Sequence, residues 1–124
     1  MNLGLYIDRS ARFWPDRPAV LFRDGQLSFR DLAQRSTRLA HALRALGLAR
    51  GDRVAIVSPN RPEIVELECA FYKLGLVKVA LNSRLAPTEL ADAFANAEPV
   101  ACIAGPEHRA MVEDAARAVP GLTH

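Results

Sequence analysis

The sequence has few cysteines, no long apolar run and no large excess of either charge. Its two cysteines, Cys69 and Cys102, lie far apart and have no companion ligands at a zinc-like spacing, so we expect both to be reduced core thiols. No apolar run approaches the roughly 20 residues that span a bilayer, and the amino terminus lacks the charged start and apolar stretch of a signal peptide. These absences predict a cytoplasmic chain with no disulfide, no structural metal and no integral membrane segment.

The charged residues are nearly balanced. Sixteen basic side chains stand against 14 acidic ones, which gives a formal net charge of +2 over 124 residues. This excess is too small and too dispersed to predict a nucleic acid or an anionic membrane as a partner. Hydrophobic residues make up 50% of the chain and charged residues 24%, which is typical of a soluble globular domain and excludes a disordered or collagen-like chain.

The first 30 residues combine a helical pattern with a hairpin pattern. Apolar residues recur at helical spacing over 3–14, and Pro15 ends that helix. Two short apolar runs follow, Ala19–Arg23 and Gln26–Phe29. The dipeptide Asp24-Gly25 lies between them and is a strong local signal for a tight turn. We therefore expect a small antiparallel hairpin.

A long amphipathic helix is predicted directly after the hairpin. Ser28 and Asp31 have the spacing of a capping box, in which each side chain accepts a hydrogen bond from the other residue's backbone. Gly47 is the expected carboxyl-terminal cap. The predicted apolar stripe of this helix contains Leu32, Leu39, Leu43 and Leu46.

Three strands are predicted in the runs that follow. Val54–Val57 is an uninterrupted apolar run of the kind found in strands buried on both faces. A second buried strand is predicted over Val77–Leu81, and a third apolar strand over Val100–Ala104. The chain stops at residues 120–124, where a further strand is expected to begin. We therefore expect that the sequence is a truncated piece of a longer chain.

Helices are predicted between and after these runs. Asn60 is the expected cap of the first, with Glu63 at its third position, and Gly75 ends it. Pro87 suits the first turn of the second, and the last covers Glu107–Val119. The expected buried residues are Ile64, Leu67, Phe71 and Leu74 on the first helix, Leu90, Ala93, Phe94 and Ala97 on the second, and Met111, Val112, Ala115, Ala116 and Val119 on the last.

Strands that alternate with helices require right-handed parallel crossovers. The predicted fold class is therefore α/β, with a partial parallel sheet, helices on its faces and a small amino-terminal β-hairpin. No repeat, low-complexity stretch or linker interrupts the chain, so we expect no domain boundary within residues 1–124.

The motifs of self-sufficient catalytic and nucleotide-binding sites are missing. Neither GxGxxG nor GxxxxGK[ST] occurs, and the seven glycines are isolated, so the chain offers no phosphate-binding loop. No serine lies in a GxSxG elbow, and His41, His108 and His124 provide no convincing general base. Glu63 and Glu66, one helical turn apart, are expected to be solvated rather than to form an acid–base pair.

The most suggestive polar segment is Asn82-Ser83-Arg84, which follows the second predicted parallel strand. Open α/β sheets bind ligands at the carboxyl ends of their strands, and the Arg84 guanidinium is suited to a phosphate or a carboxylate. A structural interpretation stays open beside this one. In it, Asn82 supports the turn and Arg84 pairs with a nearby acid such as Glu89.

Several segments in order resemble the amino-terminal region of the adenylate-forming (AMP-binding) superfamily, which includes acyl-CoA synthetases, luciferases and peptide-synthetase adenylation domains. The resemblance lies in residues 27–32 (LSFRDL), 51–56 (GDRVAI) and 71–85 (FYKLGLVKVALNSRL), with Ala42-Leu43, Leu46-Gly47 and Glu89-Leu90 at matching positions. The segment 71–85 is similar to the family's second core motif in its fatty-acyl and aryl-CoA ligase form. The chain departs from that motif at Ala80, often proline in related ligases, and at Ala86, commonly threonine.

The resemblance implies a two-step reaction. A carboxylic acid and ATP form an acyl-adenylate and pyrophosphate with the help of Mg²⁺, and the thiol of CoA then takes the acyl group. The family's phosphate loop, its adenine and ribose contacts and its carboxy-terminal lysine all lie later than this chain extends. The chain is then a scaffold part that is inactive alone and carries no catalytic residue. Arg84 is the one position carried over, as a contact for a CoA phosphate.

Two other hypotheses remain open at this stage. The absence of every phosphate motif is consistent with a stand-alone, non-catalytic α/β interaction module. The alternation of strands and helices also allows a small flavodoxin-like binding domain, although no cofactor loop is present. If the chain is instead a piece of a larger sheet, apolar strand and helix faces are left uncovered, and the isolated piece is expected to self-associate.

Overall fold

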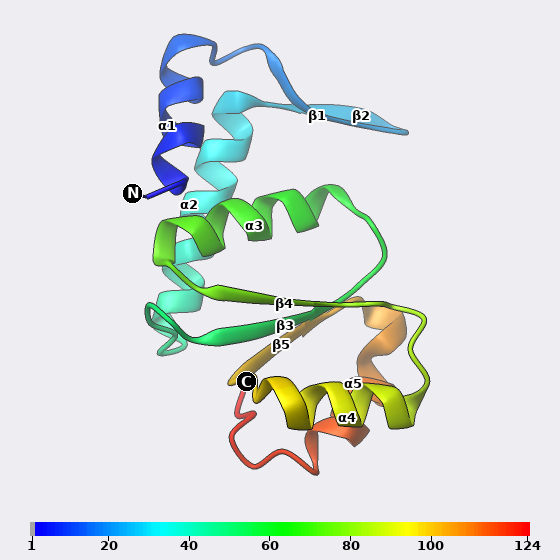
Figure 1. Ribbon diagram of the computed structural model, residues 1–124. Coiled ribbons are helices and arrows are strands. Elements are labelled where there is room, and N and C mark those ends of the chain that lie inside the picture. Colours follow the sequence, from blue (N-terminus) through cyan, green and yellow to red (C-terminus); the bar gives the residue numbers. More distant parts are fainter. Residues whose placement is uncertain (1) are drawn as a thin grey trace. The chain divides into compact units, whose positions relative to one another are not determined.

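Strands and helices alternate along the chain in the predicted order, and the α/β fold class is confirmed. The computed structural model describes residues 2–124 (Figure 1). The strands form two sheets: a two-stranded hairpin of β1 and β2, and a three-stranded sheet with the order β4-β3-β5. The elements are α1 (Gly4–Phe13), β1 (Pro18–Phe22), β2 (Gly25–Ser28), α2 (Phe29–Ala45), β3 (Arg53–Val57), α3 (Pro62–Leu74), β4 (Val77–Leu81), α4 (Pro87–Ala97), β5 (Ala101–Ala104), the 3₁₀ turn η1 (Pro106–His108) and α5 (Arg109–Ala116).

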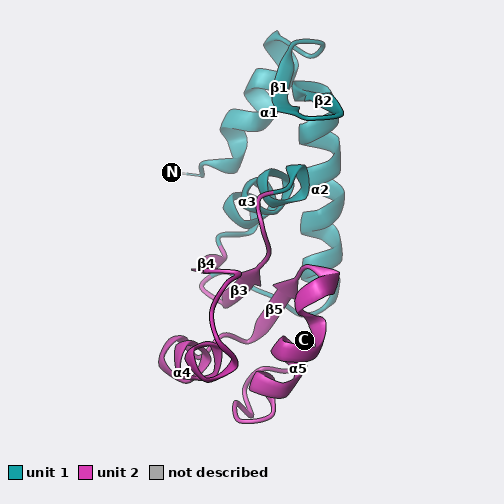
Figure 2. Cartoon of the chain, turned by 90° about the vertical axis from the view of Figure 1, so that its right-hand side faces the viewer, with its two compact units in different colours: residues 1–50, 61–75 teal, residues 51–60, 76–124 magenta. Residues whose placement is uncertain are grey.

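The elements fall into two compact units (Figure 2). The first unit contains the chain up to Arg50 together with Arg61–Gly75, and so holds the hairpin and helices α1, α2 and α3. The second contains Gly51–Asn60 and Leu76–His124, and so holds the sheet with α4, η1 and α5. The prediction that no domain boundary divides residues 1–124 stays a prediction.

The hairpin is confirmed, but its turn lies one residue earlier than predicted. Phe22 pairs with Gly25, so Arg23 and Asp24 form the loop and Gly25 belongs to β2. Within the described residues, Glu98 is the only non-glycine residue with a positive φ. Neither loop residue therefore adopts the left-handed backbone for which Asp-Gly is favoured. The predicted Asp24-Gly25 turn was wrong because Gly25 pairs with Phe22 and so belongs to the strand, which shifts the two-residue loop to Arg23 and Asp24.

Helix α2 begins with the predicted capping box. The backbone N–H of Asp31 donates to Ser28 Oγ at 3.1 Å, and the N–H of Ser28 donates to Asp31 Oδ2 at 3.2 Å. Hydrogen bonds from the Ser28 side chain and backbone lower the pKa of the Asp31 carboxyl. Because the pKa of Asp31 is lower in the folded state, these hydrogen bonds stabilise the fold at pH values above the pKa of the unfolded chain. The stabilisation is lost as the pH falls through the pKa of the folded state.

The buried face of α2 differs in part from the predicted stripe. Leu32 and Leu43 are buried as expected, whereas Leu46 is exposed and Leu48, beyond the helix, is buried instead. The helix ends at Ala45, and Gly47 follows with a φ of 93°. Leu46 still has a helical backbone, and its N–H donates to the Ala42 carbonyl; the left-handed Gly47 then turns the chain out of the helix before the buried Leu48. The buried residues of the helix are Leu32, Ser36, Ala40 and Leu43.

Helix α3 begins later than predicted. Its amino-terminal cap is Arg61, whose side chain makes no capping hydrogen bond, and Pro62 occupies the first turn. The expected Asn60 cap was wrong because proline, with a fixed φ and no N–H to satisfy, is well suited to the first helical position. The helix ends as predicted at Gly75, whose φ of 73° is left-handed.

The expectation that Glu66 is solvated was also wrong. Glu66 is only 7% exposed, and its Oε1 accepts a hydrogen bond from Arg35 Nε on α2 at 2.8 Å. The charge is buried because a cation from the neighbouring helix compensates for the lost solvation. Glu63, by contrast, is exposed as expected.

A partly buried lysine joins the three helices of the first unit. Lys73 Nζ on α3 donates to Asp8 Oδ1 on α1 at 2.7 Å, and to Thr37 Oγ1 at 2.7 Å and the Ala33 carbonyl at 3.3 Å on α2. The lysine side chain is 12% exposed. An ammonium group has three N–H donors, and here each has an acceptor, so the cation is partly buried without an unsatisfied donor.

The sheet of the second unit is parallel, as predicted. β3 pairs with β4 from Arg53 to Val57, and with β5 from Val54 to Val57. Both α4 and α5 lie along one side of the sheet (Figure 1), where they close an apolar core. The buried members of this core are Ala55 and Val57 from β3, Leu90 and Phe94 from α4, and Val112, Ala115 and Val119 from α5 and the segment after it.

The last part of the chain differs from the predicted helix over Glu107–Val119. Pro106–His108 forms a 3₁₀ turn, and the α-helix covers only Arg109–Ala116. Beyond it, the N–H of Thr123 donates to the Val100 carbonyl at 3.1 Å, and the N–H of Cys102 donates to the His124 carbonyl at 2.9 Å. The final residues thus pair with β5, where the sequence predicted that another strand would begin.

The close approach of α1 and α3 yields a test. A Cβ added at the buried Gly4 would lie 2.8 Å from both the Cα and the backbone nitrogen of Lys73. In an ordinary helix, replacing glycine by alanine stabilises by about 0.5–1 kcal/mol. Here Gly4→Ala forces α1 away from α3, and we expect a net loss in the free energy of unfolding on the order of 1–3 kcal/mol.

Urea unfolding of the purified protein would measure this loss. Gly121→Ala is the matched control, because a Cβ at that position meets nothing within 4 Å. A Gly4→Ala protein as stable as the parent would contradict the close packing of these two helices.

Candidate functional site

The three parallel strands end at one edge of the sheet, and the loops that follow them begin there. The chain passes from β3 to β4 on one side of β3, and then from β4 to β5 on the other side of β3. The winding direction therefore reverses at β3, and open α/β sheets bind ligands at the carboxyl ends of strands where this happens. This edge is the candidate site.

The turn between β4 and α4 is held by its own side chains. Asn82 Oδ1 accepts a hydrogen bond from the N–H of Arg84 at 2.9 Å, and the Asn82 carbonyl accepts one from Leu85 at 3.2 Å. The carboxylate of Glu89 accepts a hydrogen bond from the N–H of Ala86 at 2.8 Å, at the start of α4, where Ala86 itself makes no side-chain cap. The structural role predicted for Asn82 is confirmed.

Arg84 extends from this turn with its charge uncompensated. The residue is exposed, and among residues 2–124 its guanidinium makes no ion pair. In particular it does not pair with Glu89, which serves the start of α4 instead. A guanidinium group with free donors at the carboxyl edge of a parallel sheet is suited to bind an anion such as a phosphate.

His108 connects a second loop to this turn. Its Nε2 lies 2.9 Å from the Ser83 carbonyl oxygen, although the two residues belong to different loops. Its other ring nitrogen, Nδ1, is buried without a hydrogen-bond partner and lies 3.9 Å from Glu107 Oε1. From the sequence, His108 was considered only as a possible general base, and its contact with Ser83 was missed. No local sequence pattern indicates this contact, because it depends on the parallel pairing of the strands.

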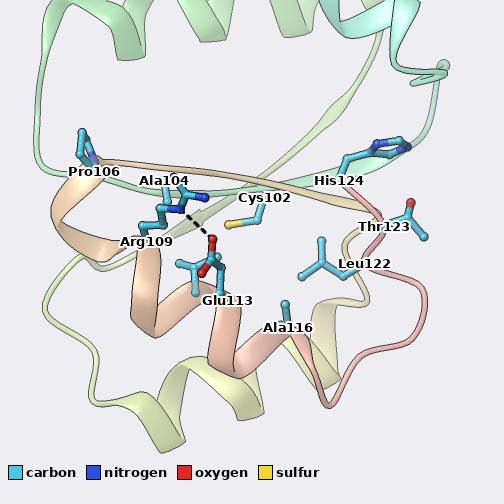
Figure 3. Close-up of a pocket in the computed structure, with 10 residues that line it drawn as sticks. Cys102, Ala104, Pro106, Arg109, Glu113, Ala116, Leu122, Thr123 and His124 are labelled. Carbon is cyan, nitrogen blue, oxygen red and sulfur yellow. Dashed lines mark hydrogen bonds and ion pairs between the residues drawn. The ribbon is translucent and has the colours of Figure 1, made fainter.

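A separate pocket lies between β5, α5 and the carboxyl-terminal segment (Figure 3). It is an open cavity of about 540 Å³ whose lining includes Cys102 and Leu122. At its rim, Arg109 Nε donates to Glu113 Oε1 at 2.7 Å, and this bond raises the pKa of Arg109. Burial raises the pKa of the Cys102 thiol to about 11, so the thiol stays protonated and is a poor nucleophile at neutral pH.

The two cysteines and His41 are not part of the candidate site. Cys69 and Cys102 are free thiols, as predicted, and burial also raises the pKa of Cys69. His41 is exposed on α2. Within residues 2–124, no three histidine, cysteine, aspartate or glutamate side chains are placed to hold a metal ion, and no helix is long and apolar enough to cross a bilayer.

The glycines also fail to form a phosphate-binding loop. Among the described residues, positive φ angles occur at Gly47, Gly51 and Gly75, of which Gly47 follows α2 and Gly75 ends α3. None of these belongs to a loop at the carboxyl edge of the parallel sheet. Within residues 2–124, the glycines therefore form no loop of the kind that holds nucleotide phosphates.

Comparisons with known proteins match this fold and sequence. The family model described as AMP-binding enzyme matches residues 7–123. The feruloyl-CoA synthase of an Amycolatopsis species is 40% identical over 111 residues, which cover 90% of this chain and 23% of that protein. A medium/long-chain-fatty-acid and 3-oxocholest-4-en-26-oate CoA ligase of Mycobacterium tuberculosis is 34% identical over 124 residues, which cover 100% of this chain and 22% of that protein.

A solved structure of the same kind of enzyme also matches this chain. The fatty acyl CoA synthetase of Mycobacterium tuberculosis superposes with a TM-score of 0.88 at 31% identity, over 98% of this chain and 25% of that one. The chain thus spans about a quarter of the length of the proteins that it matches. The match from residue 7 to residue 123 runs through both units, and it confirms the predicted resemblance: the chain belongs to the AMP-binding (adenylate-forming) enzyme family.

Proposed function

We propose that the full-length protein is an ATP-dependent, AMP-forming acyl-CoA ligase. The overall reaction converts a carboxylic acid, ATP and CoA into an acyl-CoA, AMP and pyrophosphate. The observation that carries this proposal is that relatives matched over nine-tenths or more of this chain are CoA ligases for aryl and fatty acids. The carboxylic acids named for those relatives, such as ferulate, indoleacetate and medium- and long-chain fatty acids, form the first substrate panel.

Residues 1–124 would supply scaffold to this enzyme and no catalytic group. We propose that the rest of the enzyme binds ATP and Mg²⁺; in support, no cluster of three metal-ligating side chains and no glycine-rich phosphate loop occurs among the described residues. We also propose that the two units are parts of one larger AMP-binding domain, because the family match continues through both. The proposed location of the enzyme is the cytoplasm.

A measurement on the native protein tests whether such a longer enzyme exists. Its intact mass in the source cell is expected to be several times the 13.6 kDa of this chain, because the relatives are about four times longer. The full-length protein is then expected to catalyse acid-dependent ATP–pyrophosphate exchange, and isolated residues 1–124 to catalyse none. A native mass near 13.6 kDa would overturn the ligase proposal, and exchange by the isolated piece would overturn its inactivity.

We propose that Arg84 contacts a phosphate group of CoA. The support is its exposed, uncompensated charge at the carboxyl end of β4 and the suitability of a guanidinium for phosphate. In the full-length enzyme, Arg84→Ala is expected to raise the KM for CoA about five- to tenfold and to leave ATP–pyrophosphate exchange unchanged. Arg84→Lys should recover part of the loss, because it keeps the charge without the planar donor fork.

The matched control is Arg38→Ala, which removes an exposed arginine from α2. It should change neither the KM for CoA nor the exchange rate. An unchanged KM for CoA in Arg84→Ala would exclude the proposed contact.

The isolated piece is expected to self-associate. Large apolar side chains are exposed on it, among them Leu5 and Phe13 of α1 and Leu21 of the hairpin, and association would remove them from water. Sedimentation velocity of residues 1–124 should show the sedimentation coefficient rising with concentration, and the double variant Leu5→Gln/Phe13→Gln should weaken this rise. A monomer at high concentration would contradict the expectation.

A further inference from the structure

The hydrogen bond of His108 to Ser83 links two loops at the carboxyl edge of the sheet. His108 ends the 3₁₀ turn after β5, and Ser83 lies in the turn after β4. The distance from Nε2 to the Ser83 carbonyl oxygen is 2.9 Å, which is typical of a hydrogen bond between nitrogen and oxygen. The histidine side chain is 15% exposed, so the bond is largely shielded from water.

The chemistry of the two groups fixes the direction of this bond. A backbone carbonyl oxygen can only accept, so Nε2 must carry the hydrogen and donate it. Nδ1 is buried with no hydrogen-bond partner among the described residues. An unpaired buried polar atom is unfavourable, and a less polar side chain of similar size would avoid it. The hydrogen bond from Nε2–H to the Ser83 carbonyl is therefore the polar interaction that a histidine provides at this position.

The accepting residue lies directly before Arg84. Inside the turn, Asn82 binds the N–H groups of Arg84 and Leu85, which shapes the turn locally. The bond from His108 adds an anchor from outside the turn, on the loop of a different strand. Because Ser83 and Arg84 share a peptide bond, fixing the Ser83 carbonyl restricts the orientation of the backbone from which the guanidinium extends.

We infer that His108 is a positioning residue: its Nε2–H holds the Ser83 carbonyl and thereby fixes the turn that presents Arg84 to a CoA phosphate. The consequence for CoA rests on the proposed function of Arg84. The anchoring of the turn does not rest on it and has a readout of its own.

The test compares two amide variants in the full-length enzyme. In His108→Gln, the side-chain amide nitrogen reaches the position of Nε2 and can still donate to the Ser83 carbonyl. In His108→Asn, it reaches only the position of Nδ1 and cannot. Because both variants are polar and uncharged, a general effect of losing the imidazole would appear in both. His41→Gln is the control, as it changes an exposed histidine on α2.

The first readout is hydrogen–deuterium exchange of a peptide that covers residues 82–86. Loss of the anchor is expected to speed deuterium uptake by the Arg84 and Leu85 amides about three- to tenfold in His108→Asn. His108→Gln and His41→Gln should exchange at the parental rate. Parental uptake in His108→Asn, or equally fast uptake in His108→Gln, would overturn the inference whatever the kinetics show.

The second readout is the KM for CoA, measured beside acid-dependent ATP–pyrophosphate exchange. His108→Asn is expected to raise the KM for CoA about three- to tenfold and to leave the exchange unchanged, and His108→Gln should restore the parental KM. If Arg84→Ala has no effect on this KM while His108→Asn speeds uptake, the proposed role of Arg84 fails and the anchoring stands. If Arg84→Ala raises the KM and His108→Asn does not, the inference fails and the role of Arg84 stands.

Discussion

The pairing of β3 on both of its edges is the constraint on which the second unit depends. Of the three described strands of this sheet, β3 alone pairs with another strand on each side, and Val54, Ala55 and Val57 are fully buried. A strand that is buried on both faces and paired on both edges leaves little freedom of register. Because both neighbours run parallel to it, the loops after all three strands lie at one edge. The contact between His108 and Ser83 follows from that alignment.

Features set by a few neighbouring residues could be predicted from the sequence, whereas features set by packing could not. The capping box of Ser28 and the glycine end of α3 each depend on residues within one helical turn, and both were predicted. The buried state of Glu66 depends on Arg35, which belongs to another helix, so the spacing of the acids gave no sign of it. In the hairpin, cross-strand pairing overrode a strong local turn signal at Asp24-Gly25.

The candidate site divides in the same way. Arg84 could be proposed from the sequence because it lies in the turn after a predicted parallel strand, and the sequence also indicated that Asn82 would support that turn. His108 could not be given its place, because its partner belongs to a different strand-to-helix connection. The sequence contains neither phosphate-binding motif, and the chain covers about a quarter of the length of the relatives that it matches.

The partial burial of Lys73 has a consequence for the chemical labelling of this protein. Each N–H of its ammonium group has an acceptor on α1 or α2, and the side chain is only 12% exposed. The other lysine, Lys78, is exposed on β4. An amine-directed reagent is therefore expected to modify Lys73 more slowly than Lys78. The rate at which Lys73 is modified, relative to the rate for Lys78, would therefore report on local opening of the helical unit in the folded protein.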